Sequence, residues 1–177
     1  MKQVNILISG FGGQGVLFTG KFLAYEGLLE NKEVTWLPSY GPEMRGGTAS
    51  CSVIISDTPI GSPLVPNPDV LIAMNLPSLD KFEDAVTPGG MIFYDSSLID
   101  REVKREDVKA FGIPATKIAG EEGMATLANM IIMGKMLKET SMFPVEAIDK
   151  TIQKVVSAKR QNLIELNKKA ISLGYEL

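Results

Sequence analysis

The chain has 177 residues, of which 45% are hydrophobic and 22% charged, a composition typical of one soluble globular domain. Its net charge of -3 and pI near 5.1 give no electrostatic reason to expect nucleic acid or an anionic membrane as a partner. The sequence holds no histidine and one cysteine, Cys51. A Ser-His-Asp or Cys-His device, an internal disulfide, a four-thiolate iron–sulfur site and a zinc ribbon are therefore excluded within this chain.

The first residues, MKQVNILISGFGGQGV, carry one lysine and a short apolar run that continues directly into a glycine motif. This pattern indicates a first strand rather than a signal peptide. No apolar run is long enough to span a membrane, so we expect a cytoplasmic protein.

Short apolar, β-branched runs predict strands at 4–9, 33–37, 48–56, 70–74, 91–94 and 113–118. Helical spacing of apolar residues predicts helices over 14–30 and 77–86, from 120 to a break at 141–144, after Pro144, and over 159–172 with Gly174 as the stop. Only ten residues separate the second strand from the third, which is short for a parallel crossover and favours an antiparallel strand in a mixed sheet. We expect one domain over 1–177, an α/β Rossmann-like three-layer fold with a mostly parallel sheet and C-terminal helices.

The motif Gly10-Phe11-Gly12-Gly13-Gln14-Gly15 satisfies G-x-G-x-x-G between a predicted strand and a predicted helix. In that setting the glycines permit a tight turn, and the helix N-terminus offers free N–H groups to an anion. The alternative is that the glycines only let the strand and helix pack closely.

Two nucleotide-binding patterns, that for NAD and the P-loop, are not satisfied by this sequence. NAD binding normally requires an acid at the end of the second strand, but Trp36-Leu37-Pro38 supplies none, so bound NAD is not expected. Residues 15–22 spell G-x-x-x-x-G-K but then place Phe22 where a P-loop needs Ser or Thr, and we reject this match.

The loop 38–47, PSYGPEMRGG, contains glycines and prolines that form turns. It also contains the aromatic ring of Tyr40, the hydrogen-bond-accepting carboxylate of Glu43 and the guanidinium of Arg45, which can bind an anion. From composition alone it is either a shaped turn between two strands or part of a binding site.

The segments GFGGQGV at 10–16, SYGPEMRGGTASCSVIIS at 39–56 and SPLVPNPDVLIAMN at 62–75 strongly resemble the gamma subunit of 2-oxoacid:ferredoxin oxidoreductases, as does the C-terminal stretch from Asn167 to Tyr175. The PEMRGG loop is more similar to 2-oxoglutarate and branched-chain members than to pyruvate members. The resemblance implies a multisubunit enzyme that decarboxylates a 2-oxoacid oxidatively, forms an acyl-coenzyme A and reduces ferredoxin. It places thiamine diphosphate, Mg²⁺ and [4Fe-4S] clusters on or with alpha and beta partner subunits, with a ferredoxin-like delta subunit as a further possible partner.

The same resemblance implies that this chain packs on the thiamine-binding subunits and helps form the coenzyme A side of the site, with no catalytic residue or metal ligand of its own. The residues carried over are Gly12, Gly13, Gln14, Gly15, Ser39, Tyr40, Gly41, Pro42, Glu43, Met44, Arg45, Gly46 and Gly47. Arg45 is expected to bind an anionic group of coenzyme A or substrate; the alternative role for Glu43 and Arg45 is inter-subunit ion pairing. The competing hypothesis is a free-standing Rossmann-type nucleotide-binding protein or NAD(P) oxidoreductase.

Three further features receive structural interpretations. Cys51 is expected to be a small buried residue on the same strand face as Ala49 and Val53. The run Met124, Met130, Met133 and Met136 is expected in the core or at a subunit interface. The mixed charges from Arg101 to Lys109, including Lys104, Arg105 and Asp107, are expected to form a solvated face.

Overall fold

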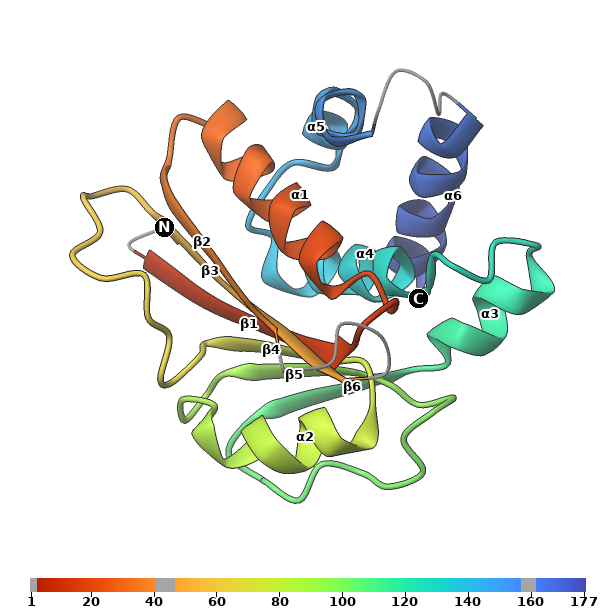
Figure 1. The fold of residues 1–177 in the computed structure, drawn as a ribbon, viewed down its shortest axis with the longest axis horizontal. Coiled ribbons are helices and arrows are strands. Elements are labelled where there is room, and N and C mark those ends of the chain that lie inside the picture. Colours follow the sequence, from red (N-terminus) through yellow and green to blue (C-terminus); the bar gives the residue numbers. More distant parts are fainter. Residues whose placement is uncertain (1–2, 41–46, 157–161) are drawn as a thin grey trace.

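The fold is described from a computed structural model for residues 3–40, 47–156 and 162–177. Six strands form one sheet, and helices cover both of its faces (Figure 1). The strands are β1 (Gln3–Phe11), β2 (Glu33–Tyr40), β3 (Thr48–Ser56), β4 (Val70–Ala73), β5 (Met91–Asp95) and β6 (Lys109–Ile113). The helices are α1 (Val16–Leu29), α2 (Leu76–Phe82), the 3₁₀ turns η1 (Glu83–Ala85) and η2 (Val145–Ala147), α3 (Ala115–Glu121), α4 (Ala128–Thr140), α5 (Ile148–Val155) and α6 (Asn162–Glu176).

The strand order is β2-β3-β1-β4-β5-β6. β3 runs antiparallel to both of its neighbours, whereas β1, β4, β5 and β6 pair in parallel. The short connection after β2 therefore returns as a hairpin, which inserts β3 between β2 and β1. The predicted mixed, mostly parallel sheet and its antiparallel third strand are confirmed.

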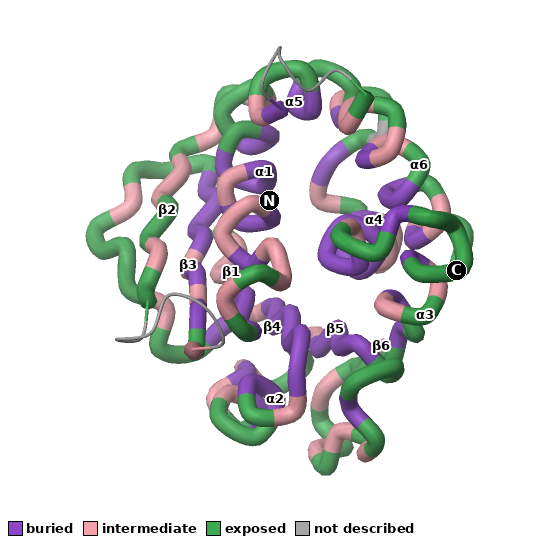
Figure 2. The backbone as a smooth tube through the Cα atoms, turned by 45° about the vertical axis from the view of Figure 1, so that its right-hand side comes forward, coloured by how far each residue is buried: buried purple, intermediate pink, exposed green. Residues whose placement is uncertain are grey.

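The two faces of the sheet carry unequal helical layers. α1, α4, α5 and α6 lie on one face, while α2 lies on the other (Figure 1). The larger layer buries side chains such as Ile8, Phe22 and Ile131, which are completely inaccessible to solvent. The central strands β4 and β5 are buried along most of their length, whereas the terminal strand β2 is largely accessible (Figure 2).

Cys51 and the methionines lie in this core. Cys51 is inaccessible to solvent, and Ala49 and Val53 on the same strand face are buried with it. Burial raises the pKa of the Cys51 thiol to about 12, and the side-chain hydrogen bond with Trp36 opposes this rise only in part. The four methionines from Met124 to Met136 are buried as well. Both structural interpretations are confirmed.

The strand predicted at 113–118 is wrong. β6 ends at Ile113, and α3 begins at Ala115. Pro114 separates them because it has no N–H to continue the ladder. The buried Asp95 carboxylate then accepts hydrogen bonds from the Thr116 N–H and hydroxyl, which fixes the start of the helix from a strand distant in sequence.

The predicted stop at Gly174 is also wrong, because α6 continues through it to Glu176. A Cβ at Gly174 would overlap the Ile131 carbonyl oxygen of α4, and a Cβ at Gly134 would overlap the Ile171 carbonyl oxygen of α6. The two helices thus cross backbone against backbone. The start of the final helix was predicted at 159, which falls in 157–161, outside the described residues. The helix predicted to begin near 120 is α4, and it begins at Ala128.

The charged segment 101–109 is not simply a solvated face. Glu83 of η1 is 4% exposed at its side chain and pairs with Arg101 at 2.7 Å. The Arg105 guanidinium donates to the Glu83 and Asp84 carbonyls, both at 3.3 Å, and to the Val86 carbonyl. A buried carboxylate requires a counter-ion, so Arg101 turns onto Glu83, while Arg105 turns onto the main-chain carbonyls beside it.

Candidate functional site

The glycine-rich turn follows β1 at the edge of the sheet where the parallel strands end. Gly10 and Phe11 are still strand residues, so the turn proper spans Gly12 to Gly15. Gly13 (φ 101°) and Gly15 (φ 76°) have left-handed backbones that other residues adopt only at a cost. The Gly12 N–H donates to the Gly47 carbonyl at 3.0 Å, which ties the turn to the start of β3. That amide is therefore occupied within the chain and does not face a ligand.

The side chain of Gln14 bridges two strand ends. Its Oε1 accepts from the Phe11 N–H (2.7 Å) and from the Asn75 amide (3.1 Å), while its Nε2 donates to the Met74 carbonyl (3.0 Å). Both ends of the Gln14 amide are thus engaged inside the protein. Its visible role is to fix the ends of β1 and β4 relative to each other.

Asn129 of α4 holds the first turn of α1, a role that the sequence analysis missed. Its Nδ2 donates to the Thr19 hydroxyl (2.9 Å) and to the Gly15 carbonyl (3.3 Å). A Cβ at Gly15 would overlap the Asn129 amide, which gives this glycine a packing requirement besides its left-handed backbone. No local pattern around Asn129 signals this contact, because its partners lie over a hundred residues away.

Two cavities open at this edge of the sheet. The turn cavity, of about 310 Å³, is lined by Phe11, Gly12, Gly13, Gly15, Val16, Leu17, Phe18, Tyr40 and Ala49. The hydroxyl cavity, of about 210 Å³, is lined by Ser9, Ser39, Tyr40, Thr48, Ser50, Pro77, Ser78, Lys81 and Phe82. Tyr40, at the end of β2, borders both. The structure thus brings five predicted residues, Gly12, Gly13, Gly15, Ser39 and Tyr40, to adjoining cavities.

The two cavities differ in chemistry. Aliphatic and aromatic side chains with glycine backbone line the turn cavity, whereas five hydroxyl-bearing Ser and Thr side chains and the Lys81 ammonium line the hydroxyl cavity. No Asp, Glu, His or Cys is among the described lining residues of either one. These surfaces can hold an apolar chain and a polar or anionic group.

The remaining predicted residues are Gly47, which accepts the hydrogen bond from Gly12, and the segment 41–46. Gly41, Pro42, Glu43, Met44, Arg45 and Gly46 lie outside the described residues. Their expected contacts stay predictions.

The position of β2 explains why the end of this strand carries no ribose-binding acid. A ribose-binding acid normally stands on the strand next to β1, and here that neighbour is the antiparallel β3. The end of β2 is one strand further away, where Tyr40 pairs with Ala49. At the edge of β1 itself the neighbouring residues are Thr48 and Ala49, which cannot replace the acid.

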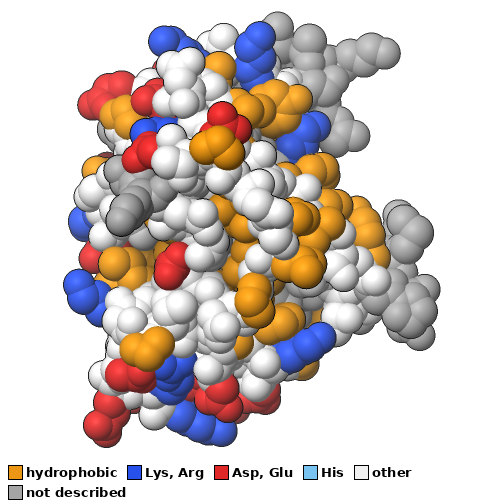
Figure 3. Space-filling view, turned by 90° about the vertical axis from the view of Figure 1, so that its left-hand side faces the viewer, with side chains coloured by type: hydrophobic (Ala, Val, Ile, Leu, Met, Phe, Trp, Pro, Cys, Tyr) orange, Lys and Arg blue, Asp and Glu red, His pale blue; other side chains and the backbone are white. Residues whose placement is uncertain are grey.

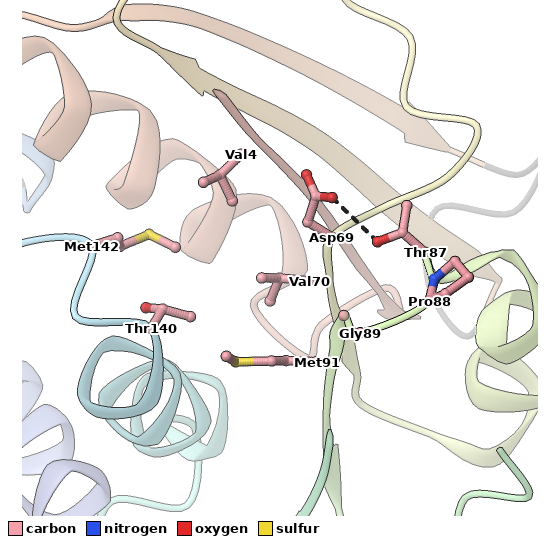
Figure 4. Close-up of a pocket in the computed structure, with 10 residues that line it drawn as sticks. Val4, Asp69, Val70, Thr87, Pro88, Gly89, Met91, Thr140 and Met142 are labelled. Carbon is pink, nitrogen blue, oxygen red and sulfur yellow. Dashed lines mark hydrogen bonds between the residues drawn. The ribbon is translucent and has the colours of Figure 1, made fainter. Parts of the chain in front are cut away.

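A third cavity, of about 290 Å³, lies at the opposite edge of the sheet (Figure 4). Val4, Val70, Met91 and Met142 contribute apolar side chains to it. The Asp69 carboxylate beside it accepts from the Asn5 N–H (2.8 Å) and the Thr87 hydroxyl (3.2 Å), so it fixes the strand starts. Ligands of open α/β sheets bind at the carboxyl ends of the strands, which favours the turn and hydroxyl cavities.

The strand order and the glycine-rich turn define a Rossmann-like α/β domain with two adjoining cavities at the carboxyl ends of its strands. The family model described as pyruvate ferredoxin/flavodoxin oxidoreductase matches residues 5–177. The chain belongs to this family. In the parts of the chain that the structure describes, no helix has the length and apolar character needed to cross a bilayer.

Three similar proteins place the chain more closely. The ketoisovalerate oxidoreductase subunit VorA of Methanothermobacter thermautotrophicus is 41% identical over 98% of this chain, which spans only 36% of that relative. The 2-oxoglutarate synthase subunit KorC of Methanocaldococcus jannaschii is 37% identical, with 98% of this chain and 92% of that relative covered. The solved keto/oxoacid ferredoxin oxidoreductase gamma subunit of Geobacter sulfurreducens PCA is 29% identical, with a TM-score of 0.81 and coverage of 98% and 96%.

Proposed function

We propose that this chain is the gamma subunit of a multisubunit 2-oxoacid:ferredoxin oxidoreductase. The observation that carries the proposal is the family match over residues 5–177, and its similarity to KorC and to the Geobacter gamma subunit, each covered over more than nine-tenths of its length, supports it. The complete enzyme oxidatively decarboxylates a 2-oxoacid, forms the acyl-coenzyme A and passes electrons to ferredoxin. A free-standing nucleotide oxidoreductase is not favoured.

The reacting groups then belong to alpha and beta subunits, with a delta subunit as a further candidate. One cysteine, buried and with its pKa raised to about 12, does not fit an iron–sulfur cluster. Among the described residues, no group of three His, Cys, Asp or Glu side chains is placed to hold a metal ion. We therefore assign thiamine diphosphate, Mg²⁺ and the clusters to the partner chains.

The turn and hydroxyl cavities form the wall of the site on the coenzyme A and substrate side. Coenzyme A combines anionic phosphates with a long, partly apolar arm. The hydroxyl groups and Lys81 fit an anionic group, and the turn cavity beside them fits the arm. Ser39 and Tyr40, at the start of the 39–47 segment, line these cavities, and Arg45 of the same segment is our candidate for a phosphate or carboxylate contact.

The substrate is a 2-oxoacid larger than pyruvate, with 2-oxoglutarate as first choice and a branched-chain 2-oxoacid as second. The loop similarity and the names of the two relatives, 2-oxoglutarate synthase and ketoisovalerate oxidoreductase, support these two substrates. Affinity purification of the tagged chain from its source cell, native mass measurement, and a 2-oxoacid panel with coenzyme A and an artificial electron acceptor test it. Recovery of a lone chain with its own oxidoreductase activity would contradict the proposal.

Tyr40 tests the site itself in the assembled complex. Removing an aromatic side chain from a binding site weakens binding about ten- to hundredfold. Tyr40→Ala is therefore expected to raise KM for coenzyme A or the 2-oxoacid about tenfold. Tyr40→Phe keeps the ring and removes the hydroxyl, so it shows which of the two contributes to binding. Leu98 is an exposed apolar residue after β5, and Leu98→Ala is the matched control. Arg45→Ala extends the test to the predicted anion contact. Unchanged KM values and turnover in the Tyr40→Ala and Arg45→Ala complexes would remove both residues from the site.

A further inference from the structure

The outward face of α1 is apolar. Its inner side buries Phe22 and Leu23 completely, yet Tyr25, Leu28 and Leu29 on the outer side are 37%, 56% and 38% exposed. The one cation on this outer side, Lys21, lies 5.7 Å from the centre of the Tyr25 ring. A helix that is apolar all round is normally covered on both sides, and nothing in the described chain covers this side of α1.

The apolar face continues onto the terminal strand β2. Trp36, 41% exposed, packs beside α1, with its Nε1 only 3.1 Å from the position of a Cβ on Gly20. We name Tyr25, Leu28, Leu29 and Trp36 the α1–β2 surface. Figure 3 shows hydrophobic side chains gathered in a band across this side of the molecule. Leu17 and Phe18 of the same helix line the turn cavity, so the surface leads into the candidate site.

The size of this surface suits a subunit interface. Together with Tyr40, which borders the adjoining turn cavity, this surface has an accessible area on the order of 500 Å², from the exposed fractions of these side chains and about 150–250 Å² for each aromatic one. That is more than half of the roughly 800 Å² that each partner contributes to a standard interface. The charged residues Glu30, Lys32 and Glu33 follow directly in sequence, which fits an apolar centre with a polar rim.

The partner contacts this surface through side chains rather than by adding a strand. Among the described strands β2 is hydrogen-bonded only to β3, and no described strand lies along its other edge. Pro38, within β2, has no N–H and interrupts the row of donors that an added strand would need. The edge is thereby protected against strand addition while Trp36 and α1 remain accessible.

We propose that the α1–β2 surface binds the partner polypeptide that corresponds to the part of VorA outside the match. The chain spans 36% of VorA but 92% of KorC, so one domain occurs both joined to a larger segment and separate from it. Where the covalent link is absent, a stable interface must replace the high effective concentration that the link provides. This inference rests on the proposed function.

A second copy of this chain is a poorer occupant. The surface adjoins a site whose described lining has no Asp, Glu, His or Cys, and the sequence has no histidine. A second copy would bring only the same residue types to that site. Under the proposed function the reacting groups belong to other subunits, which favours a different polypeptide as the occupant.

The test uses the tagged full-length chain co-expressed with its partner subunits. Tyr25→Lys/Leu28→Lys is expected to lower co-purification of the partner at least tenfold, because charges replace two central apolar contacts. Leu98→Lys, 46% exposed and outside the surface, is expected to match the unsubstituted chain. Thermal melting of each chain checks the fold.

A photo-crosslinking residue at Leu28 gives a second measurement that does not depend on destabilising the complex. Crosslinks to the partner that corresponds to the remainder of VorA support the proposal, and crosslinks only to another copy of this chain, or to none, overturn it. If the unsubstituted chain recovers partners and the double variant recovers them equally, the surface is wrong while the proposed function stands. If the unsubstituted chain recovers no partner, the proposed function fails as well.

Discussion

Glycines perform different tasks in two regions of this molecule, the turn after β1 and the crossing of α4 with α6. In the turn, Gly13 and Gly15 have positive φ angles that side chains disfavour. At the crossing, Gly134 and Gly174 are ordinary helical residues whose missing side chains let two backbones touch. The first task follows from local backbone geometry, and the second depends on an element more than thirty residues away in sequence.

This difference determines which glycines the sequence reveals. A strand, G-x-G-x-x-G and a helix follow one another in the chain, so the turn is predictable from its neighbours. Gly174 comes late in a periodic helical segment, where a terminating glycine is equally common. Substitutions with alanine separate the two tasks, since alanine favours helices but adds a Cβ.

The largest effect is expected at the helix crossing. Gly174→Ala places a Cβ on the Ile131 carbonyl oxygen. Because this oxygen belongs to the backbone, α4 and α6 must move apart. We expect a loss of about 3 kcal/mol in the free energy of unfolding, at the upper end of typical overpacking costs. Urea titration followed by circular dichroism measures it.

The control for this substitution is Gly120→Ala in α3. A Cβ there meets no heavy atom within 4 Å, so alanine should stabilise the protein by about 0.5–1 kcal/mol. Equal losses at both positions would show that the crossing imposes no special requirement.

A smaller loss is expected in the turn. Gly15→Ala combines an unfavourable left-handed backbone with displacement of the Asn129 amide, for a total of about 2 kcal/mol. Gly13→Ala meets no neighbouring atom and should cost only the backbone part, about 1 kcal/mol. The difference between their unfolding midpoints measures the contact with Asn129, and identical midpoints would argue against that role.

The sequence predicted most of what local rules determine. The first five strands, α1 and the inserted antiparallel strand all follow from apolar runs and a short connection. The start of α3 did not, because Asp95 fixes it from another strand, and β-branched residues at Ile113 and Ile118 imitate a strand. Ion pairing of Arg101 with Glu83 was missed for the same reason, since each looks like a surface charge in its own segment.

The candidate site shows the same division. Gly12, Gly13, Gly15, Ser39 and Tyr40 were predicted and do line adjoining cavities. Lys81 and Ser78 reach the hydroxyl cavity from α2, and no local motif marks them as site residues. In the structure the Asn75 side chain caps that helix by accepting from the Ser78 N–H at 2.9 Å, which positions Ser78 beside the cavity.

Gly20 lies between the two glycine classes, because its close contact is a side chain rather than backbone. A Cβ there would overlap the Cys51 sulfur and approach Trp36. Gly20→Ala is expected to cost about 1–2 kcal/mol, and Cys51→Ala in the same chain should recover part of that loss by making room. A double-mutant cycle from urea titrations gives the coupling, and strictly additive losses would show that the sulfur is not the obstacle.

The smallest effect on the free energy of unfolding is expected at Glu26. This carboxylate, rather than a glycine, lies where α1 packs on α5. Glu26 is inaccessible to solvent, and neither of its oxygens has a hydrogen-bond partner in the described chain. Burial raises the pKa of this carboxyl group above its usual value; the nearby Thr151 side chain opposes the rise, and Glu30 adds to it. The folded protein therefore favours the protonated form.

The consequence for stability follows from the sign of this shift. Because the pKa is higher in the folded state than in the unfolded state, the contribution of Glu26 is fully present below the unfolded pKa and is lost as pH rises through the folded pKa. Glu26→Gln cannot ionise, so its free energy of unfolding should match that of the unsubstituted chain near pH 4 and exceed it increasingly toward pH 8. Urea titrations across this range measure the difference, with Glu121→Gln, whose side chain is 64% exposed, as the control. A constant offset between the two curves would mean that folding does not raise the pKa of Glu26, and that the α1–α5 contact tolerates a buried anion where the α4–α6 contact tolerates not even a methyl group.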